Sequence, residues 1–135
     1  MKTTNFEISK KLKEAGFEAE TDYNFIKRNN QEVFLINIKE LSGIEIMNEI
    51  GVFIESYDLE TILDALPSVI ERKGWGNDIY FKMNKNGFWY ENSCSCDSSE
   101  YCPLETYYHI DRQKNESLAD TAGKMWLLLK EKGMV

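Results

Sequence analysis

Three stretches of the chain space their apolar residues with the period of an amphipathic helix. The first covers residues 5–15. The second begins after Asp58, a good N-cap residue, and stops before Pro67, which lacks an amide hydrogen and crowds the preceding turn. A further turn is expected over residues 68–72, and the third helix covers residues 117–132. The pattern therefore predicts three helices, each burying one apolar stripe.

The first predicted helix carries signals at both of its ends. Thr4 and Glu7 have the spacing of a capping box, in which each side chain bonds the other residue's amide. Ile8 and Leu12 lie on one face, and Gly16 can end the helix in a left-handed conformation. We expect this helix to pack through the Ile8 face.

Alternating apolar and polar residues, rich in β-branched and aromatic types, indicate strands in the rest of the chain. The segments are residues 21–27, 32–38, 52–55, 77–83, 88–92 and 105–111. Residues 85–87 have the composition of a hairpin turn, with Gly87 at the position that needs positive φ. The order of these elements predicts an α+β fold. We expect an antiparallel sheet of about five strands and three helices in a single compact domain covering residues 1–135.

The charge of the chain argues against two kinds of partner. The 135 residues include 16 basic and 23 acidic ones, a net charge of −7. Nucleic acids and anionic membranes attract an excess of lysine and arginine, so we expect direct binding to neither. Residues 41–111 hold four basic and 13 acidic residues, so the negative charge is concentrated in the middle of the chain.

Acidic residues cluster on and near the second predicted helix, notably Glu60, Asp64 and Glu71. One interpretation is a patch that steers a basic protein partner, such as a protein that handles nucleic acid. The other is a solvated helix face that maintains solubility. Charge reversal at these three positions distinguishes the two, because only the first makes partner binding depend on them at low salt.

Aromatic residues gather in the hairpin and the last strand. Strand alternation places Trp89 and Tyr107 on the side away from the core, where they could anchor a protein interface. Equally, they could form cross-strand pairs that stabilise the sheet. The sequence leaves both interpretations open.

A cysteine cluster is the one candidate metal site. Cys94, Cys96 and Cys102, with His109, could supply a tetrahedral zinc ion with three thiolates and an imidazole. The spacing lacks the paired knuckles of structural zinc sites, and a loop with inert or redox-active thiols is the alternative. We therefore expect no cofactor, with zinc as the alternative that metal analysis would test.

Signatures of catalysis and of export are lacking. The single histidine, and the lack of phosphate-binding and dinucleotide-binding glycine motifs, favour a protein that is not an enzyme. An enzyme or small-molecule binder without a sequence signature is a weaker alternative. The N-terminus shows no apolar leader, and the odd, clustered cysteine count favours a reducing cytoplasm.

Three segments resemble a family of small proteins from phages, prophages and bacterial mobile elements. They are residues 11–17, 57–67 and 115–130, about a quarter of the chain, and their motifs are helix packing patterns. The resemblance implies a compact α+β domain without known catalytic residues. Together with the acidic charge, it predicts a non-enzymatic accessory protein that binds another protein, such as a host or defence factor.

Overall fold

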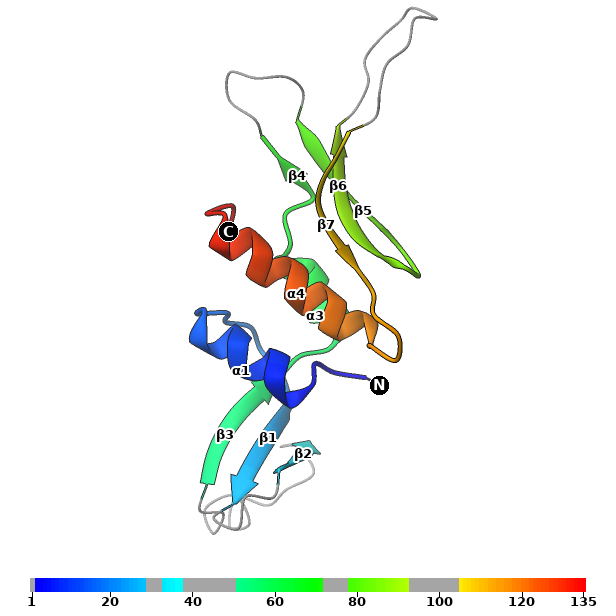
Figure 1. Cartoon of the computed structure of the whole chain (residues 1–135). Coiled ribbons are helices and arrows are strands. Elements are labelled where there is room, and N and C mark those ends of the chain that lie inside the picture. The colour runs from blue at the N-terminus through cyan, green and yellow to red at the C-terminus, as the bar shows by residue number, and fades with distance from the viewer. Residues whose placement is uncertain (1, 29–32, 38–50, 72–77, 93–104) are drawn as a thin grey trace, which may run out of the picture.

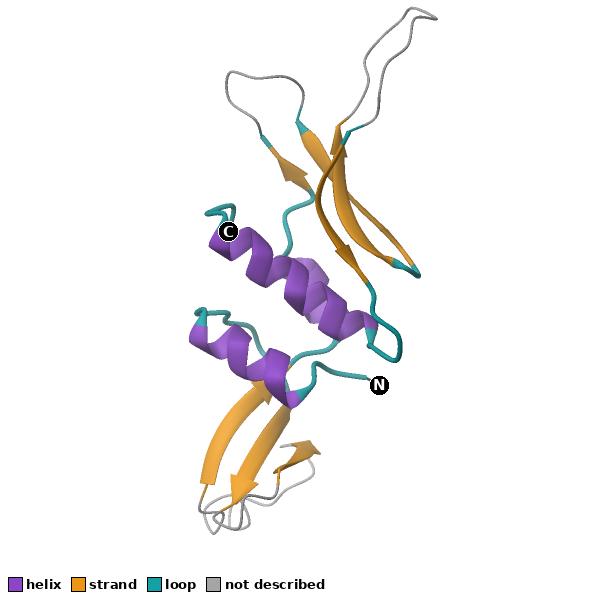
Figure 2. Ribbon diagram, viewed as in Figure 1, coloured by secondary structure: helices purple, strands orange, loops and turns teal. Residues whose placement is uncertain are grey.

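Three helices lie between two antiparallel sheets in the described part of the chain (Figures 1 and 2). The computed structural model describes residues 2–28, 33–37, 51–71, 78–92 and 105–135. The helices are α1 (Phe6–Glu14), α3 (Leu59–Ala65) and α4 (Leu118–Glu131). One sheet has the order β2-β1-β3, with β1 (Tyr23–Arg28), β2 (Val33–Asn37) and β3 (Gly51–Ser56). The other has the order β4-β5-β6-β7, with β4 (Val69–Ile70), β5 (Ile79–Asn84), β6 (Gly87–Asn92) and β7 (Thr106–Asp111).

The elements stack in layers along the molecule (Figure 1). The three-stranded sheet contacts α1 through β3, α1 contacts α4, and α4 contacts both α3 and the face of β6 and β7. The predicted α+β class is confirmed. The expected single sheet of about five strands is wrong, because the helices separate the strands into two sheets.

The start of α1 differs from the predicted capping box. Asn5 is the N-cap, and its Oδ1 accepts a hydrogen bond from the Ile8 amide at 2.8 Å. Thr4 is fully buried, with its Oγ1 2.6 Å from Ser9 Oγ. It also accepts a hydrogen bond from the Tyr57 amide at 3.1 Å. The expected Thr4 cap is wrong because this hydroxyl bonds a residue distant in sequence instead.

The end of α3 follows the prediction, but the segment after it does not. Asp58 caps α3, accepting a hydrogen bond from the amide three residues on, and the helix ends before Pro67. The expected turn over residues 68–72 is wrong in its described part, where β4 pairs with β5. The Ser68 carbonyl accepts a hydrogen bond from the Phe81 amide at 2.9 Å, which fixes this extended conformation.

Helix α4 begins in a polar contact with the start of α1. Ser117 caps α4, and the buried Asp120 accepts a hydrogen bond from the Asn5 amide at 2.6 Å. Gly123 lets the two helices approach closely, since a Cβ there would lie 2.7 Å from Ile8 Cγ2. The position of α1 against α4 is thus set by the hydrogen bond to Asp120 and by the lack of a Cβ at Gly123.

The hairpin of β5 and β6 closes at Gly87, as predicted. Its φ is +158°, and a Cβ there would lie 2.3 Å from the Ile110 carbonyl oxygen. The register places Phe81 opposite Tyr90, so apolar residues of both strands share one face. Phe88 and Tyr90 are fully buried on this face, which packs on α4.

A β-bulge interrupts the alternation of β7. Phe88 pairs with Ile110 but Tyr90 pairs with Tyr107, which leaves one additional residue in β7. Tyr108 lies near this irregularity with a φ of +52°. Tyr107 therefore faces the core and is half-buried, so the expectation that it lies away from the core is wrong.

Candidate functional site

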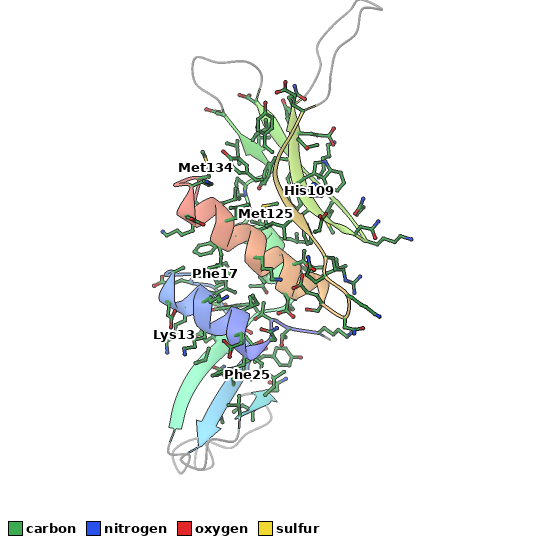
Figure 3. All side chains as sticks on the ribbon, in the orientation of Figure 1. Lys13, Phe17, Phe25, His109, Met125 and Met134 are labelled. Atoms are coloured by element: carbon green, nitrogen blue, oxygen red, sulfur yellow. The ribbon has the colours of Figure 1, made fainter. Side chains whose placement is uncertain are left out.

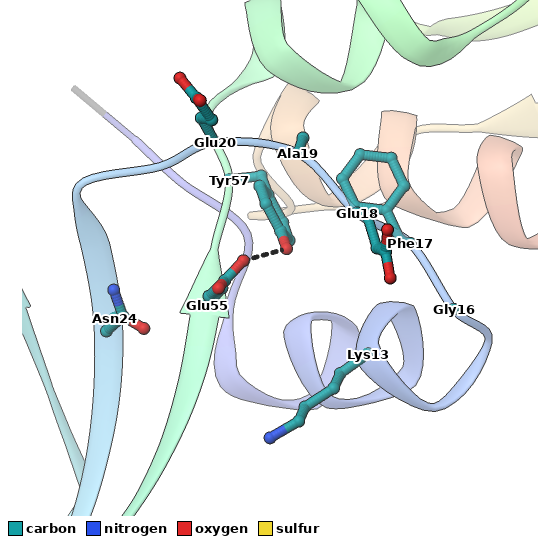
Figure 4. Close-up of a pocket in the computed structure, with 9 residues that line it drawn as sticks. All are labelled: Lys13, Gly16, Phe17, Glu18, Ala19, Glu20, Asn24, Glu55 and Tyr57. Atoms are coloured by element: carbon teal, nitrogen blue, oxygen red, sulfur yellow. Dashed lines mark hydrogen bonds between the residues drawn. The ribbon is translucent and has the colours of Figure 1, made fainter.

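A pocket of about 640 Å³ opens where the chain leaves α1 and passes over the three-stranded sheet (Figure 4). It is lined by Lys13, Gly16, Phe17, Glu18, Ala19, Glu20, Asn24, Glu55 and Tyr57. These residues come from the end of α1, the segment after it, β1, β3 and the residue that follows β3. The pocket thus joins segments that are more than 30 residues apart in the sequence.

The segment after α1 is held in place by a glycine and an aromatic cluster. Gly16 has a φ of +87°, as the sequence predicted, and the Phe17 amide donates to the Leu12 carbonyl at 2.9 Å. The Phe17 ring lies between α1 and α4 (Figure 3), with its centroid 4.7 Å from that of Tyr57 and 4.9 Å from that of Trp126. This packing fixes the backbone that carries the next residues into the pocket.

Carboxylates dominate the charge of the pocket. Glu18, Glu20 and Glu55 line it, against a single ammonium group from Lys13. Glu55 is exposed on β3 and accepts a hydrogen bond from the Tyr57 hydroxyl at 2.7 Å, drawn in Figure 4. The lining therefore carries a net negative charge and faces solvent.

Tyr57 responds to this charge. Burial raises the pKa of its phenol, and the hydrogen bond to Glu55 and the charges of Glu55 and Glu18 raise that pKa further. The phenol is therefore neutral at physiological pH. The phenol keeps its proton, which it donates in the hydrogen bond to Glu55, and its oxygen can still accept a hydrogen bond from another group.

Asn24 is a nearly buried amide side chain in the lining of the pocket. It lies on β1 directly opposite Glu55 on β3 and is only 4% exposed. Its side chain points toward Glu55 in Figure 4. Among the residues that the structure describes, none forms a hydrogen bond with this carboxamide. Its amide atoms keep some contact with the solvent in the pocket, since no fully buried polar side-chain atom of the described residues lacks a partner.

The acidic residues predicted from the sequence lie elsewhere. Glu60 and Asp64 are exposed one turn apart on α3, and the exposed Glu71 follows β4. Glu60 also lines a groove of about 410 Å³ together with Lys2 and Arg112. Since Asp58 also lines this groove, its two acidic and two basic residues balance, whereas the pocket beside α1 holds three carboxylates and one lysine.

The predicted aromatic residues separate onto the two faces of the four-stranded sheet. Trp89 lies on the face opposite to Tyr90, and its Nε1 donates to Glu91 Oε1 at 3.0 Å. Its ring centroid lies 5.8 Å from that of His109. Tyr107 lies on the other face, against the core. These two predicted binding residues therefore do not form one surface.

The zinc hypothesis remains a prediction. Cys94, Cys96 and Cys102 lie outside the described residues. His109 is on the outer side of the four-stranded sheet (Figure 3), with its Nε2 3.0 Å from Asp111 Oδ1. Within the described ranges, no group of three or more histidine, cysteine or acidic side chains is placed to hold a metal ion.

The sequence did not indicate the pocket, because the acidic residues that line it from the N-terminal region are balanced by basic residues when charges are counted over residues 1–40. Residues 1–40 hold equal numbers of basic and acidic residues, which conceals the run Glu18, Glu20 and Asp22. Three acids in five positions without a base were the available signal. Glu55 lies three residues before Asp58, the cap of the second predicted helix, and nothing in the sequence places it beside this run.

Comparisons with protein-family models, curated proteins and solved structures found no match to the chain. The resemblance to small phage and mobile-element proteins therefore stays a prediction. No helix in the described part of the chain is both long and apolar enough to cross a membrane.

Proposed function

We propose that this chain is a non-enzymatic accessory protein, of phage or mobile-element type, that binds a protein partner with a basic surface. The observation that carries this proposal is the pocket beside α1, with carboxylates from Glu18, Glu20 and Glu55 against one lysine. Opposite charge on a partner both accelerates encounter and fixes the register of docking. A host or defence factor fits the expected setting.

The concave site supports binding better than the predicted helix face. Charges on an exposed helix interact through water and are strongly screened by salt. Carboxylates inside a pocket lose part of that water when a partner docks, so their attraction for a cation is stronger. Lys2 and Arg112 line the same groove as Glu60 and Asp58, and these two positive charges weaken the negative field there.

The described lining of the pocket contains no histidine, cysteine, serine or threonine. These are the side chains that most often act as nucleophiles or, for histidine, as the general base. These features support a binding role rather than a catalytic one.

Two matched triple variants test the proposal. E18Q/E20Q/E55Q removes three negative charges from the pocket, and E60Q/D64N/E71Q removes three from the predicted acidic face. Each variant is immobilised and exposed to host-cell lysate, and bound proteins are eluted with salt and identified by mass spectrometry. Circular dichroism first confirms that both variants fold.

We expect the unmodified chain and the α3-side variant to retain the same basic protein, and the pocket variant to lose it at low salt. Because both variants have the same net charge, a difference between them comes from position. Equal retention by all three proteins, or selective loss in the α3-side variant, would contradict binding at the pocket.

A further inference from the structure

The polar atoms of the pocket are mostly hydrogen-bond acceptors. The carboxylates of Glu18, Glu20 and Glu55 only accept, and the Tyr57 hydroxyl has already donated its proton to Glu55. Lys13 already has an interaction partner. A ligand that complements this lining must therefore bring several donors and a positive charge.

Asn24 provides an independent sign that a ligand belongs in the pocket. The residue is only 4% exposed, its carboxamide keeps the remaining contact with solvent, and no described residue hydrogen-bonds that carboxamide. A ligand that displaces this remaining solvent must supply a hydrogen bond in its place, because an amide left without a partner is unfavourable. A donor placed between Asn24 and Glu55, which face each other across β1 and β3, would satisfy the Asn24 carbonyl and the carboxylate together.

The arrangement of acceptors favours a planar cation over a compact one. Glu18 and Glu20 come from the segment after α1, whereas Glu55 and Asn24 come from the sheet. A guanidinium has five N–H donors fixed in one plane, so it can reach acceptors on separate walls at once. It is also more weakly hydrated than an ammonium group, and its flat face packs on aromatic rings such as those of Phe17 and Tyr57.

We infer that the pocket binds a guanidinium group, supplied by an arginine side chain of the basic partner. The inference rests on the proposed function, which by itself requires only a basic partner and no preference between arginine and lysine. It adds Asn24 as a residue that determines this preference, since its carboxamide helps to recognise the fork of donors.

The test uses the full chain and three probes in fluorescence anisotropy and calorimetry. Two labelled peptides share one sequence and differ only in carrying arginine or lysine at every basic position, and the third probe is N-acetylarginine amide. The chains compared are the unmodified protein, E18Q/E55Q, N24L and the control E131Q, which removes an exposed charge from the end of α4. Thermal unfolding checks that each variant folds.

We expect the arginine peptide to bind about tenfold tighter than the lysine peptide, the equivalent of one well-formed charge-assisted pair. E18Q/E55Q should weaken both peptides, N24L should remove the arginine preference, and E131Q should change neither. If N24L fails to fold, N24D replaces it. A carboxylate at this position still accepts hydrogen bonds but attracts lysine as strongly as arginine, so N24D should also reduce the preference for the arginine peptide.

Each of the other possible results contradicts a specific part of the inference. Equal affinity for both peptides, lost in E18Q/E55Q, overturns the guanidinium inference and leaves the proposed function standing. Binding that E18Q/E55Q does not weaken overturns the assignment to this pocket. N-acetylarginine amide binding as tightly as the peptide overturns the partner as the source of the guanidinium. No binding of either peptide overturns the inference and the proposed function together.

Discussion

The two sheets join the helices through interfaces that differ in their buried polar groups. The four-stranded sheet presents the fully buried rings of Phe88 and Tyr90 to the core that includes α4. Beside the three-stranded sheet, where α1 meets β3, lie the fully buried hydroxyl groups of Thr4, Ser9 and Ser56. The Thr4 hydroxyl is hydrogen-bonded to both serine hydroxyls. The first interface is therefore apolar and aromatic, whereas the second combines a buried hydroxyl cluster with an aromatic contact between Phe6 of α1 and Phe25 of β1.

The two interfaces therefore make different contributions: apolar burial mainly stabilises the fold, and hydrogen bonds mainly fix where individual groups lie. Burial of apolar area stabilises in proportion to the area removed from water and specifies little about direction. Hydrogen bonds contribute less net free energy but fix where each group lies. The hydroxyl groups also contact the Tyr57 backbone, because Thr4 Oγ1 accepts from the Tyr57 amide at 3.1 Å. The polar interface thus positions a residue that lines the pocket.

The largest effect should come from the aromatic interface. Phe88→Ala removes a fully buried ring and leaves a cavity, so we expect a loss of about 3–5 kcal/mol in the free energy of unfolding. Urea titration followed by circular dichroism measures it. Met83→Ala on the same sheet face is the control, because Met83 is 42% exposed and should cost well under 1 kcal/mol. A Phe88→Ala cost as small as that of Met83→Ala would show that this interface does not dominate stability.

A smaller loss should come from the polar interface. Thr4→Val keeps the side-chain shape but leaves the Tyr57 amide without its partner, at a cost of about 1–3 kcal/mol. The Ser9 hydroxyl loses its contact with Thr4 Oγ1 and keeps its hydrogen bond to the Thr4 carbonyl. The exposed Thr106→Val is the control. We also expect Thr4→Val to weaken binding of the arginine peptide, because Tyr57 loses a contact that positions it. Unchanged stability and unchanged binding would mean that the hydroxyl groups neither stabilise the fold nor position Tyr57.

The sequence could predict what depends on near neighbours. The three helices, Asp58 as a cap, Pro67 as a stop and Gly87 at the hairpin follow from local periodicity and turn chemistry, and the structure confirms them. The division of the strands into two sheets depends on which strands meet across long loops. Periodicity carries no information on that pairing.

The misses have the same physical origin. Thr4 has the local features of a cap, but a hydrogen bond to the amide of a residue 53 positions away decides its role. The bulge in β7 shifts Tyr107 to the core face, which strict alternation cannot anticipate. The pocket combines a segment after α1 with β1 and β3, so only the fold brings its carboxylates together.

The smallest effect should come from the start of α4, which contacts both α1 and the four-stranded sheet. Burial alone would raise the pKa of Glu116, but hydrogen bonds from Lys124, Thr121 and the Gln113 amide outweigh it and lower that pKa below its usual value. A carboxyl whose pKa is lower in the folded state contributes stability that is present above its unfolded pKa. That contribution is lost as the pH falls through the folded pKa.

We therefore expect Glu116→Gln to reduce the free energy of unfolding by about 1 kcal/mol at neutral pH, a modest value because Lys124 is partly exposed. The difference between Glu116→Gln and the unmodified chain should shrink as the pH is lowered below about 4, where the unfolded carboxyl is protonated. Urea titrations at pH values from neutral to acid measure this, with the exposed Glu131→Gln as control. Since α4 joins both interfaces, the loss should appear equally in the unfolding of both sheets. A loss confined to one sheet would show that the two interfaces unfold independently, and a difference that grows toward acid pH would contradict the role of the Glu116 carboxylate.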